Sequence, residues 1–169
     1  MAVASGAVPA PVPAQSSRRA WIPRTVPVNI PALVLVVAGA VVQLVALAGS
    51  TWFDNPSGRL GFTGMREWSR PGYAQMFFGW IGWLLVAVTA IVGIAACVHW
   101  SAAGVFRYLG AVMGVLGAFA TVGAVLLLAY QTHDDSFHVA RNYSAGPYLA
   151  VLGLLACALG AAAGTGRRG

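Results

Sequence analysis

Four long apolar segments, separated by polar stretches, constrain the fold of this chain more than any other feature of its sequence. They run from about residue 30 to 48, 76 to 98, 105 to 130 and 147 to 163. Each approaches or exceeds the roughly 20 residues that a helix needs to cross a bilayer core, and none carries a charge in its interior. We therefore expect an all-α fold, an integral membrane four-helix bundle with a long first outer loop.

The composition agrees with lipid surroundings. Of the 169 residues, 59% are hydrophobic and 8% are charged, whereas about a quarter of the residues in a soluble domain are charged. All ten basic residues are Arg, and they are scattered between the apolar segments, so no nucleic-acid partner is predicted. The use of Arg without Lys, together with abundant Ala, Gly and Val, is typical of a GC-rich bacterium such as an actinobacterium.

The two ends of the chain differ from its middle. Residues 1–28 are rich in Ala and Pro, with five prolines between Pro9 and Pro27, and they show no helical periodicity. Proline removes backbone donors and interrupts helices, so this stretch is predicted to be a disordered cytoplasmic tail. Residues 29–164 form the predicted transmembrane domain, and residues 165–169 form a second, short cytoplasmic tail.

The arginines also indicate the orientation, because cytoplasmic loops of membrane proteins are enriched in Lys and Arg. With the N-terminus inside, six arginines fall in cytoplasmic segments and four in outer loops. The six are Arg18, Arg19, Arg24, Arg107, Arg167 and Arg168, and the four are Arg59, Arg66, Arg70 and Arg141. We therefore predict a multi-pass protein of the inner (plasma) membrane with both termini cytoplasmic.

One alternative concerns the first span. Ala46, Leu47 and Ala48 precede Gly49 and resemble the small-residue cleavage site of a signal peptide. Cleavage there would remove the first helix and leave the orientation of the others unchanged.

Small residues recur every three or four positions in three of the spans. In lipid, helices associate mainly by close packing over such residues. The stripes are Gly39, Gln43 and Ala46 in the first span; Gly110, Gly114 and Gly117 in the third; and Gly146, Gly153 and Gly160 in the fourth. These stripes are predicted to pack the helices together, with docking onto a larger partner as the alternative.

Gln43 is the strongly polar side chain that lies deepest in a span. An amide in hydrocarbon must find a hydrogen-bond partner, so we expect it to bond a backbone carbonyl, Thr89 or Thr121. The two cysteines, Cys97 and Cys157, fall inside apolar segments and are expected to be packing residues, not a disulfide.

The first outer loop combines aromatic and basic residues. Such a mixture suits a loop that lies on lipid headgroups or against a partner protein. The predicted interface residues of this loop are Trp52, Phe53, Phe62 and Trp68.

The second outer loop contains His133, Asp134, Asp135 and His138. Imidazoles and carboxylates at this spacing could hold Zn or Cu, although a wet loop is commonly polar for no other reason. We predict no catalytic residue and no cofactor, because no nucleophile, base and oxyanion site occur together in the sequence.

Three features carry a resemblance at the level of topology. They are the Pro-rich leader with its arginines, the loop beginning Ser50-Thr51-Trp52-Phe53, and the last span opening with Gly146-Pro147-Tyr148. In these the chain resembles small four-helix membrane proteins of actinobacteria, such as the tryptophan-operon-associated membrane proteins and accessory subunits of envelope complexes like LucB of the Mce lipid importer.

The spans carry no charges for transport, whereas the small-residue faces and the aromatic loop are available for docking. We therefore predict a non-catalytic accessory or scaffold subunit that docks in the membrane onto a larger envelope complex, and lipid or fatty-acid import is the setting that the resemblance implies. Its expected partners are membrane lipids and a larger membrane protein complex. Two alternatives remain: a small oligomeric transporter or channel, and a metal-binding outer-surface sensor or enzyme.

Overall fold

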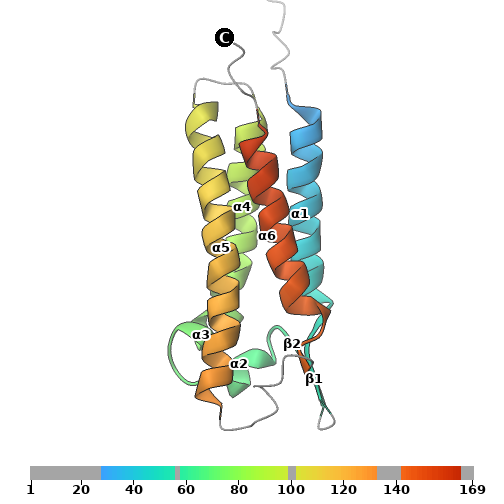
Figure 1. Cartoon of the computed structure of the whole chain (residues 1–169), viewed down its shortest axis with the longest axis vertical. Coiled ribbons are helices and arrows are strands. Elements are labelled where there is room, and N and C mark those ends of the chain that lie inside the picture. Colours follow the sequence, from blue (N-terminus) through green and yellow to red (C-terminus); the bar gives the residue numbers. More distant parts are fainter. Residues whose placement is uncertain (1–27, 56–57, 99–101, 133–141, 165–169) are drawn as a thin grey trace, which may run out of the picture.

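The computed structural model describes residues 28–55, 58–98, 102–132 and 142–164. Within these residues it has four helical segments that are long and apolar enough to cross a membrane. They are α1 (Ile30–Ala48), the continuous segment Tyr73–Cys97, α5 (Ala103–Gln131) and α6 (Ala145–Ala162). This confirms the predicted set of four apolar helices and indicates a multi-pass membrane protein (Figure 1).

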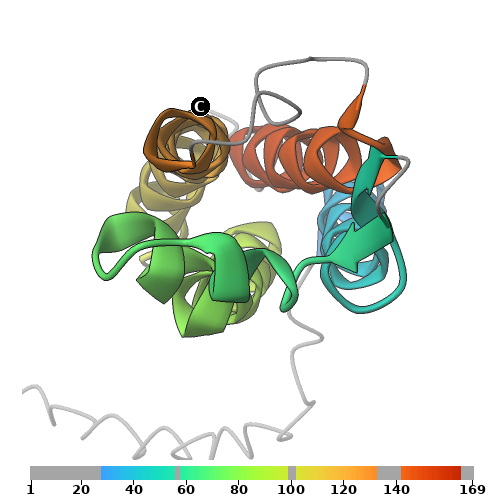
Figure 2. The ribbon, with the colours of Figure 1, turned by 90° about the horizontal axis from the view of Figure 1, so that it is seen from below.

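The four helical segments lie side by side. Seen along their length, α6 is flanked by α1 and α5, and the second segment closes the arrangement opposite α6 (Figure 2). The first helix begins at a cap: the Asn29 side chain accepts a hydrogen bond from Ala32 N at 3.3 Å and donates to Ala163 O at 2.7 Å. One side chain therefore caps the start of α1 and binds the end of α6.

The second segment begins before the apolar run and contains an irregular turn. It comprises α3 (Tyr73–Met76), the π-helical turn η1 (Phe77–Ile81) and α4 (Gly82–Cys97). A π turn inserts an extra residue into the helix and shifts the faces on either side of it. Here it accompanies two consecutive aromatic residues, Phe77 and Phe78, that are both buried.

The segment between α1 and α3, which is the predicted first outer loop and keeps that name below, is folded. Strand β1 (Thr51–Asn55) pairs antiparallel with β2 (Gly58–Gly61), and the one-turn helix α2 (Met65–Trp68) follows. Gly58 has a φ of 153°, which side-chain-bearing residues rarely adopt. An isolated bridge between Phe53 and Tyr143 attaches the hairpin to the segment that precedes α6.

Buried side chains form two clusters at different levels of the helices. An aromatic cluster lies where the folded outer loop meets the helix ends, and its largest members are Trp52, Phe53, Phe62, Phe77 and Phe78. The other cluster, which consists of Ala32, Val36, Cys97 and Cys157, lies toward the opposite end.

Candidate functional site

The closest contact between long helices is the seam between α1 and α6. A Cβ atom added to Gly39 would lie 2.6 Å from Gly153 O, and one added to Gly153 would lie 2.6 Å from Gly39 O. At Gly160 an added Cβ would lie 2.9 Å from Ala32 O. Cβ atoms essentially never approach oxygen so closely, so the two backbones are in contact and only Gly fits at these positions.

The glycines of α5 are also used within the chain. A Cβ on Gly110 would lie 2.7 Å from the Ala161 side chain, and one on Gly114 would lie 2.8 Å from Leu154 O. Gly117 packs against Leu85 and Leu154. Helix α5 therefore packs against α6 through the first half of α5, and it packs against α4 near Gly117.

The structure places all nine residues of the predicted stripes inside the chain. Gln43 and Ala46 are buried, and Gly146 packs against the Trp52 ring. These stripes already contact neighbouring helices of the same chain, so a partner protein would have to use other residues.

Gln43 is 1% exposed, and its partner differs from the expected ones. Its Nε2 donates to Cys157 Sγ at 3.3 Å, and Cys157 Sγ donates to Val36 O at 3.4 Å. The expected Thr89 and Thr121 hydroxyls instead donate to carbonyls of their own helices, Leu85 O at 2.7 Å and Gly117 O at 2.9 Å. Hydroxyls of mid-helix Thr residues commonly bond back to the i−4 carbonyl, and this explains the difference.

Trp52 joins the aromatic cluster to α1. Its indole is fully buried and makes edge contacts with Phe62 at 5.0 Å and Phe78 at 5.7 Å between ring centroids. Its Nε1 donates to Ala46 O at 2.6 Å, one of the carbonyls that the end of α1 leaves without a partner within the helix. The outer loop is thus fixed to α1 by both packing and a hydrogen bond.

The burial of this cluster corrects the predicted outer-loop interface. Trp52, Phe53 and Phe62 are each 1% exposed or less, so they form the core of the folded loop and present no surface to a partner. Trp68 is different, because it is 49% exposed. The error arose because an apolar ring in a loop sequence can serve either a surface or a core, and only the fold decides between them.

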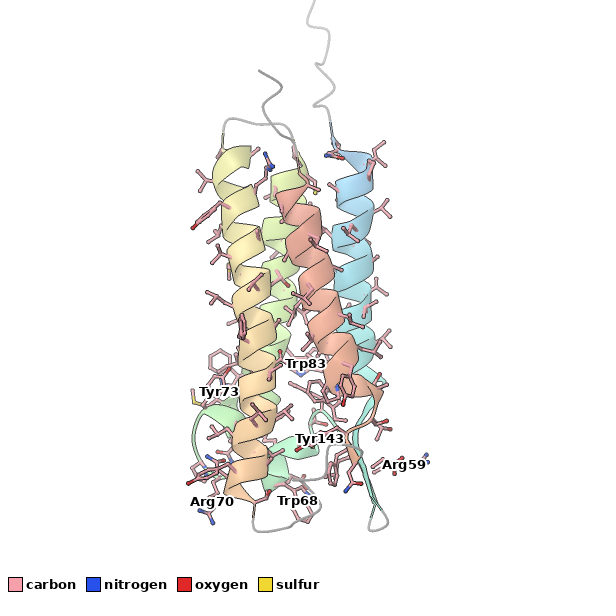
Figure 3. The ribbon with its side chains drawn as sticks, in the orientation of Figure 1. Arg59, Trp68, Arg70, Tyr73, Trp83 and Tyr143 are labelled. Carbon is pink, nitrogen blue, oxygen red and sulfur yellow. The ribbon has the colours of Figure 1, made fainter. Side chains whose placement is uncertain are left out.

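Trp68 belongs to a firmly attached part of the outer loop. Met65 is fully buried beneath α2, and the buried Ser69 hydroxyl donates to Met65 O at 2.8 Å. The same short helix exposes Arg66, and Arg70 follows it on the surface. Figure 3 shows Trp68 and Arg70 at the end of the molecule that carries the hairpin. We call Arg66, Trp68 and Arg70 the outer rim.

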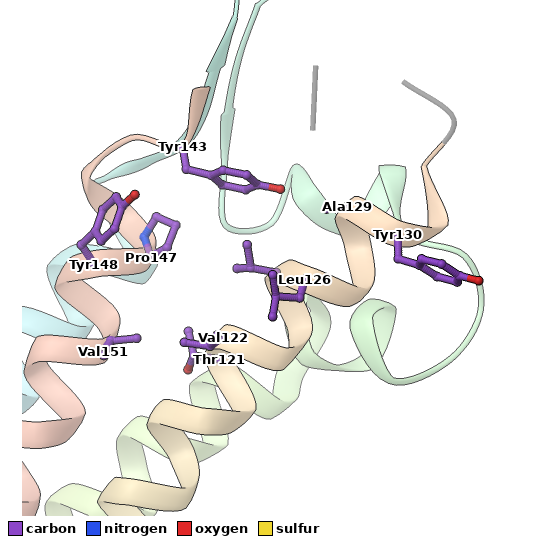
Figure 4. Close-up of a pocket in the computed structure, with 10 residues that line it drawn as sticks. Thr121, Val122, Leu126, Ala129, Tyr130, Tyr143, Pro147, Tyr148 and Val151 are labelled. Carbon is purple, nitrogen blue, oxygen red and sulfur yellow. The ribbon is translucent and has the colours of Figure 1, made fainter. Parts of the chain in front are cut away.

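A cavity of about 430 Å³, which no residue pattern predicted, lies between the C-terminal part of α5 and the N-terminal part of α6 (Figure 4). We call it the α5–α6 groove. Its lining residues are Thr121, Val122, Val125, Leu126, Ala129, Tyr130, Tyr143, Pro147, Tyr148 and Val151. Burial raises the pKa of Tyr143 to about 12, so this phenol is neutral at physiological pH.

Comparison of the chain with protein-family models, curated proteins and solved structures finds no significant match. The resemblance to small actinobacterial membrane proteins therefore stays a prediction, and the function has to be argued from the geometry.

The predicted metal ligands His133, Asp134, Asp135 and His138 lie outside the described residues. Among the residues that are described, no group of three or more His, Cys, Asp or Glu side chains could hold a metal ion.

Proposed function

We propose that this membrane protein is a non-catalytic accessory or scaffold subunit that docks onto a larger envelope complex of the same membrane. Both termini lie in the cytoplasm, and the hairpin and α2 lie on the outer side of the inner membrane. A lipid or fatty-acid importer of the Mce type is the proposed setting.

The observation that carries this proposal is the outer rim. An aromatic ring flanked by two arginines is the composition from which energetically dominant contacts in protein interfaces are usually built. The rim also stands on a buried support, since Met65 of α2 belongs to the aromatic cluster and the Ser69 hydroxyl closes the same helical turn by bonding back to Met65 O. A preorganised surface loses little conformational entropy when a partner binds.

The internal packing of the helices favours a scaffold function over a transporter or channel function. A small oligomeric transporter would need a wet path along Gln43 and the glycine stripes. Gln43 is instead enclosed by the α1–α6 seam and bonded to Cys157, and the stripe glycines meet atoms of neighbouring helices.

The orientation is supported by the distribution of charge. The outer rim and Arg59 share one end of the described structure, where Arg59 Nε lies 3.2 Å from Asp54 Oδ2. Arg107 lies at the opposite end, where its Nη2 donates to Ala162 O at 2.7 Å. The segments before α1 and after α6 add five arginines to the Arg107 side, so six of the ten arginines of the sequence belong to that side, which the preference for cytoplasmic Arg assigns to the cytoplasm.

The test is purification of tagged protein from its native membranes in mild detergent. We expect a stoichiometric larger membrane protein to copurify and to be lost from Trp68→Ala, because removal of a dominant aromatic contact costs about 2 kcal/mol, or roughly a 30-fold loss of affinity.

Trp80→Ala is the matched control, because Trp80 is 55% exposed but lies in the second membrane segment and not on the outer rim. It should retain the partner. Wild-type protein that purifies alone, or a partner that Trp68→Ala retains as well as Trp80→Ala does, would refute docking through the outer rim.

A further inference from the structure

The α5–α6 groove has the position of a lipid site. Alpha5 and α6 are in close contact at Gly110 and Gly114, and the groove lies farther along the same two helices, from Thr121 onward. Both helices are candidate membrane spans, and the groove runs along the last part of α5, with its Thr121 end toward the hydrocarbon core and its Tyr130 end toward the level of the hairpin.

The groove is long enough for part of an acyl chain. Its lining on α5 runs from Thr121 to Tyr130, nine residues apart. Its lining on α6 runs from Pro147 to Val151, four residues apart. At 1.5 Å per residue these walls are about 13 Å and about 6 Å long, whereas one leaflet of the hydrocarbon core extends roughly 15 Å. The groove can therefore hold part of a single extended chain between the two helices.

The polarity of the lining changes along the groove in the way a lipid requires. Val122, Val125 and Val151 line its deeper part together with Thr121, whose hydroxyl donates to Gly117 O of its own helix, and the described lining contains no charged side chain. The hydroxyl-bearing rings of Tyr143 and Tyr148 stand at its outer end, and Figure 4 shows Tyr143 pointing from the segment before α6 toward α5. Tyrosine favours this level of a bilayer, between the hydrocarbon and the headgroups.

We propose that the α5–α6 groove binds one acyl chain of an outer-leaflet phospholipid, with the headgroup beside Tyr143 and Tyr148. An uncharged apolar channel matches the chain, and the tyrosine hydroxyls match the ester and headgroup region. This proposal requires membrane insertion but no protein partner, so it can hold even if docking through the outer rim is refuted.

The test uses the full-length protein in phosphatidylcholine vesicles that contain a phosphatidylcholine with a photoreactive diazirine in one acyl chain. After irradiation, the labelled positions are mapped by peptide mass spectrometry. Groove residues Val122 and Leu126 should be labelled more than Leu116 and Phe119, whose exposed fractions on the same helix are similar or larger. Equal labelling at these four positions would show that the groove holds lipid no longer than the rest of the surface does, which would overturn the proposal.

Filling the groove provides the second arm. Val125→Phe/Val151→Phe places two rings in it, and we expect labelling of Val122 and Leu126 to fall about tenfold as the dispersion contacts of the bound chain are lost. The matched control is Val105→Phe/Val115→Phe, at two exposed positions of α5 outside the groove. It should label like wild type, and undiminished labelling of the filled variant would contradict the proposal.

Other occupants give different results. Excess unlabelled fatty acid that abolished labelling of the groove would identify a free fatty acid in place of a phospholipid. A groove that stayed unlabelled while two copies of the chain became cross-linked through it would identify a second copy. Unchanged labelling at Leu116 and Phe119 in the filled variant shows that it has folded and inserted, and Val151→Phe alone repeats the test with a smaller change.

Discussion

Gly153→Ala is expected to lower the free energy of unfolding by about 2 kcal/mol or more, although it adds a single methyl group, because overpacking a rigid contact typically costs 1–3 kcal/mol. The added Cβ would lie 2.6 Å from Gly39 O and 3.0 Å from Gln43 N, so backbone atoms of α1 would have to move. The measurement is unfolding in mixed micelles, monitored by circular dichroism.

Gly123→Ala is the matched control for this substitution. Gly123 lies within α5, and an added Cβ there meets no atom within 4 Å. Because Ala has the higher helix propensity, this variant should be neutral or up to about 1 kcal/mol more stable. If Gly153→Ala and Gly123→Ala changed the free energy of unfolding equally, the close backbone contact between α1 and α6 would be contradicted.

A double-mutant cycle sharpens the result. Gly39→Ala faces the same backbone contact from α1 and should be similarly destabilising. A single separation of the two helices relieves both clashes, so the double variant Gly39→Ala/Gly153→Ala should be less destabilised than the sum of the single variants. Strict additivity would mean that the two glycines do not share a contact.

Trp52→Ala is expected to have the largest effect of any single aromatic substitution, about 3–5 kcal/mol, the usual range for a buried Trp or Phe. It removes the ring contacts to Phe62 and Phe78 together with the hydrogen bond to Ala46 O. Trp52→Phe, which keeps an aromatic ring and loses the donor, should fall between Trp52→Ala and wild type.

The control for Trp52→Ala is again Trp80→Ala, whose indole is 55% exposed. It should change the free energy of unfolding by less than about 1 kcal/mol. Limited proteolysis shows where the structure is weakened. Loss of Trp52 should expose the outer loop to cleavage before the spans unfold. An outer loop that stayed resistant in Trp52→Ala would show that the aromatic cluster does not hold it in place.

The helices could be predicted from the sequence because a segment that crosses a membrane must be about 20 residues long, apolar and helical. The first span is the clearest case: the apolar run predicted from about residue 30 to 48 coincides with α1, Ile30–Ala48. The small-residue periodicity likewise singled out Gly39 and Gly153, which meet in the structure. It could not show which helices would pair.

The fold of the outer loop could not be predicted, because irregularities of its backbone interrupt the alternation of buried and exposed residues that marks a regular strand. Trp52 and Phe53 are neighbours in the sequence and both buried, whereas a regular strand would point them to opposite faces. The pairing register shifts between Thr51 and Phe53, which turns both rings inward. The π turn at Phe77 and Phe78 has the same consequence in a helix.

The α5–α6 groove was missed for another physical reason. Its lining is ordinary Val, Leu and Tyr, the same residues that face lipid elsewhere on these helices. A cavity of this kind depends on where two helices separate, and no residue type marks that point. The sulfur partner of Gln43 was missed because Cys157 was assigned to apolar packing alone.

Labelling of single introduced cysteines tests the four-span arrangement most directly. The positions are Arg59→Cys in β2, Thr132→Cys after α5, Ala102→Cys before α5 and Ala163→Cys after α6. Cys97 and Cys157 are buried and can remain, with the wild-type protein as the unlabelled control. A membrane-impermeant maleimide should label Arg59→Cys and Thr132→Cys in intact cells, and Ala102→Cys and Ala163→Cys only after permeabilisation. Labelling of Arg59→Cys and Thr132→Cys from opposite sides would contradict four crossings, and complete reversal of the pattern would contradict cytoplasmic termini.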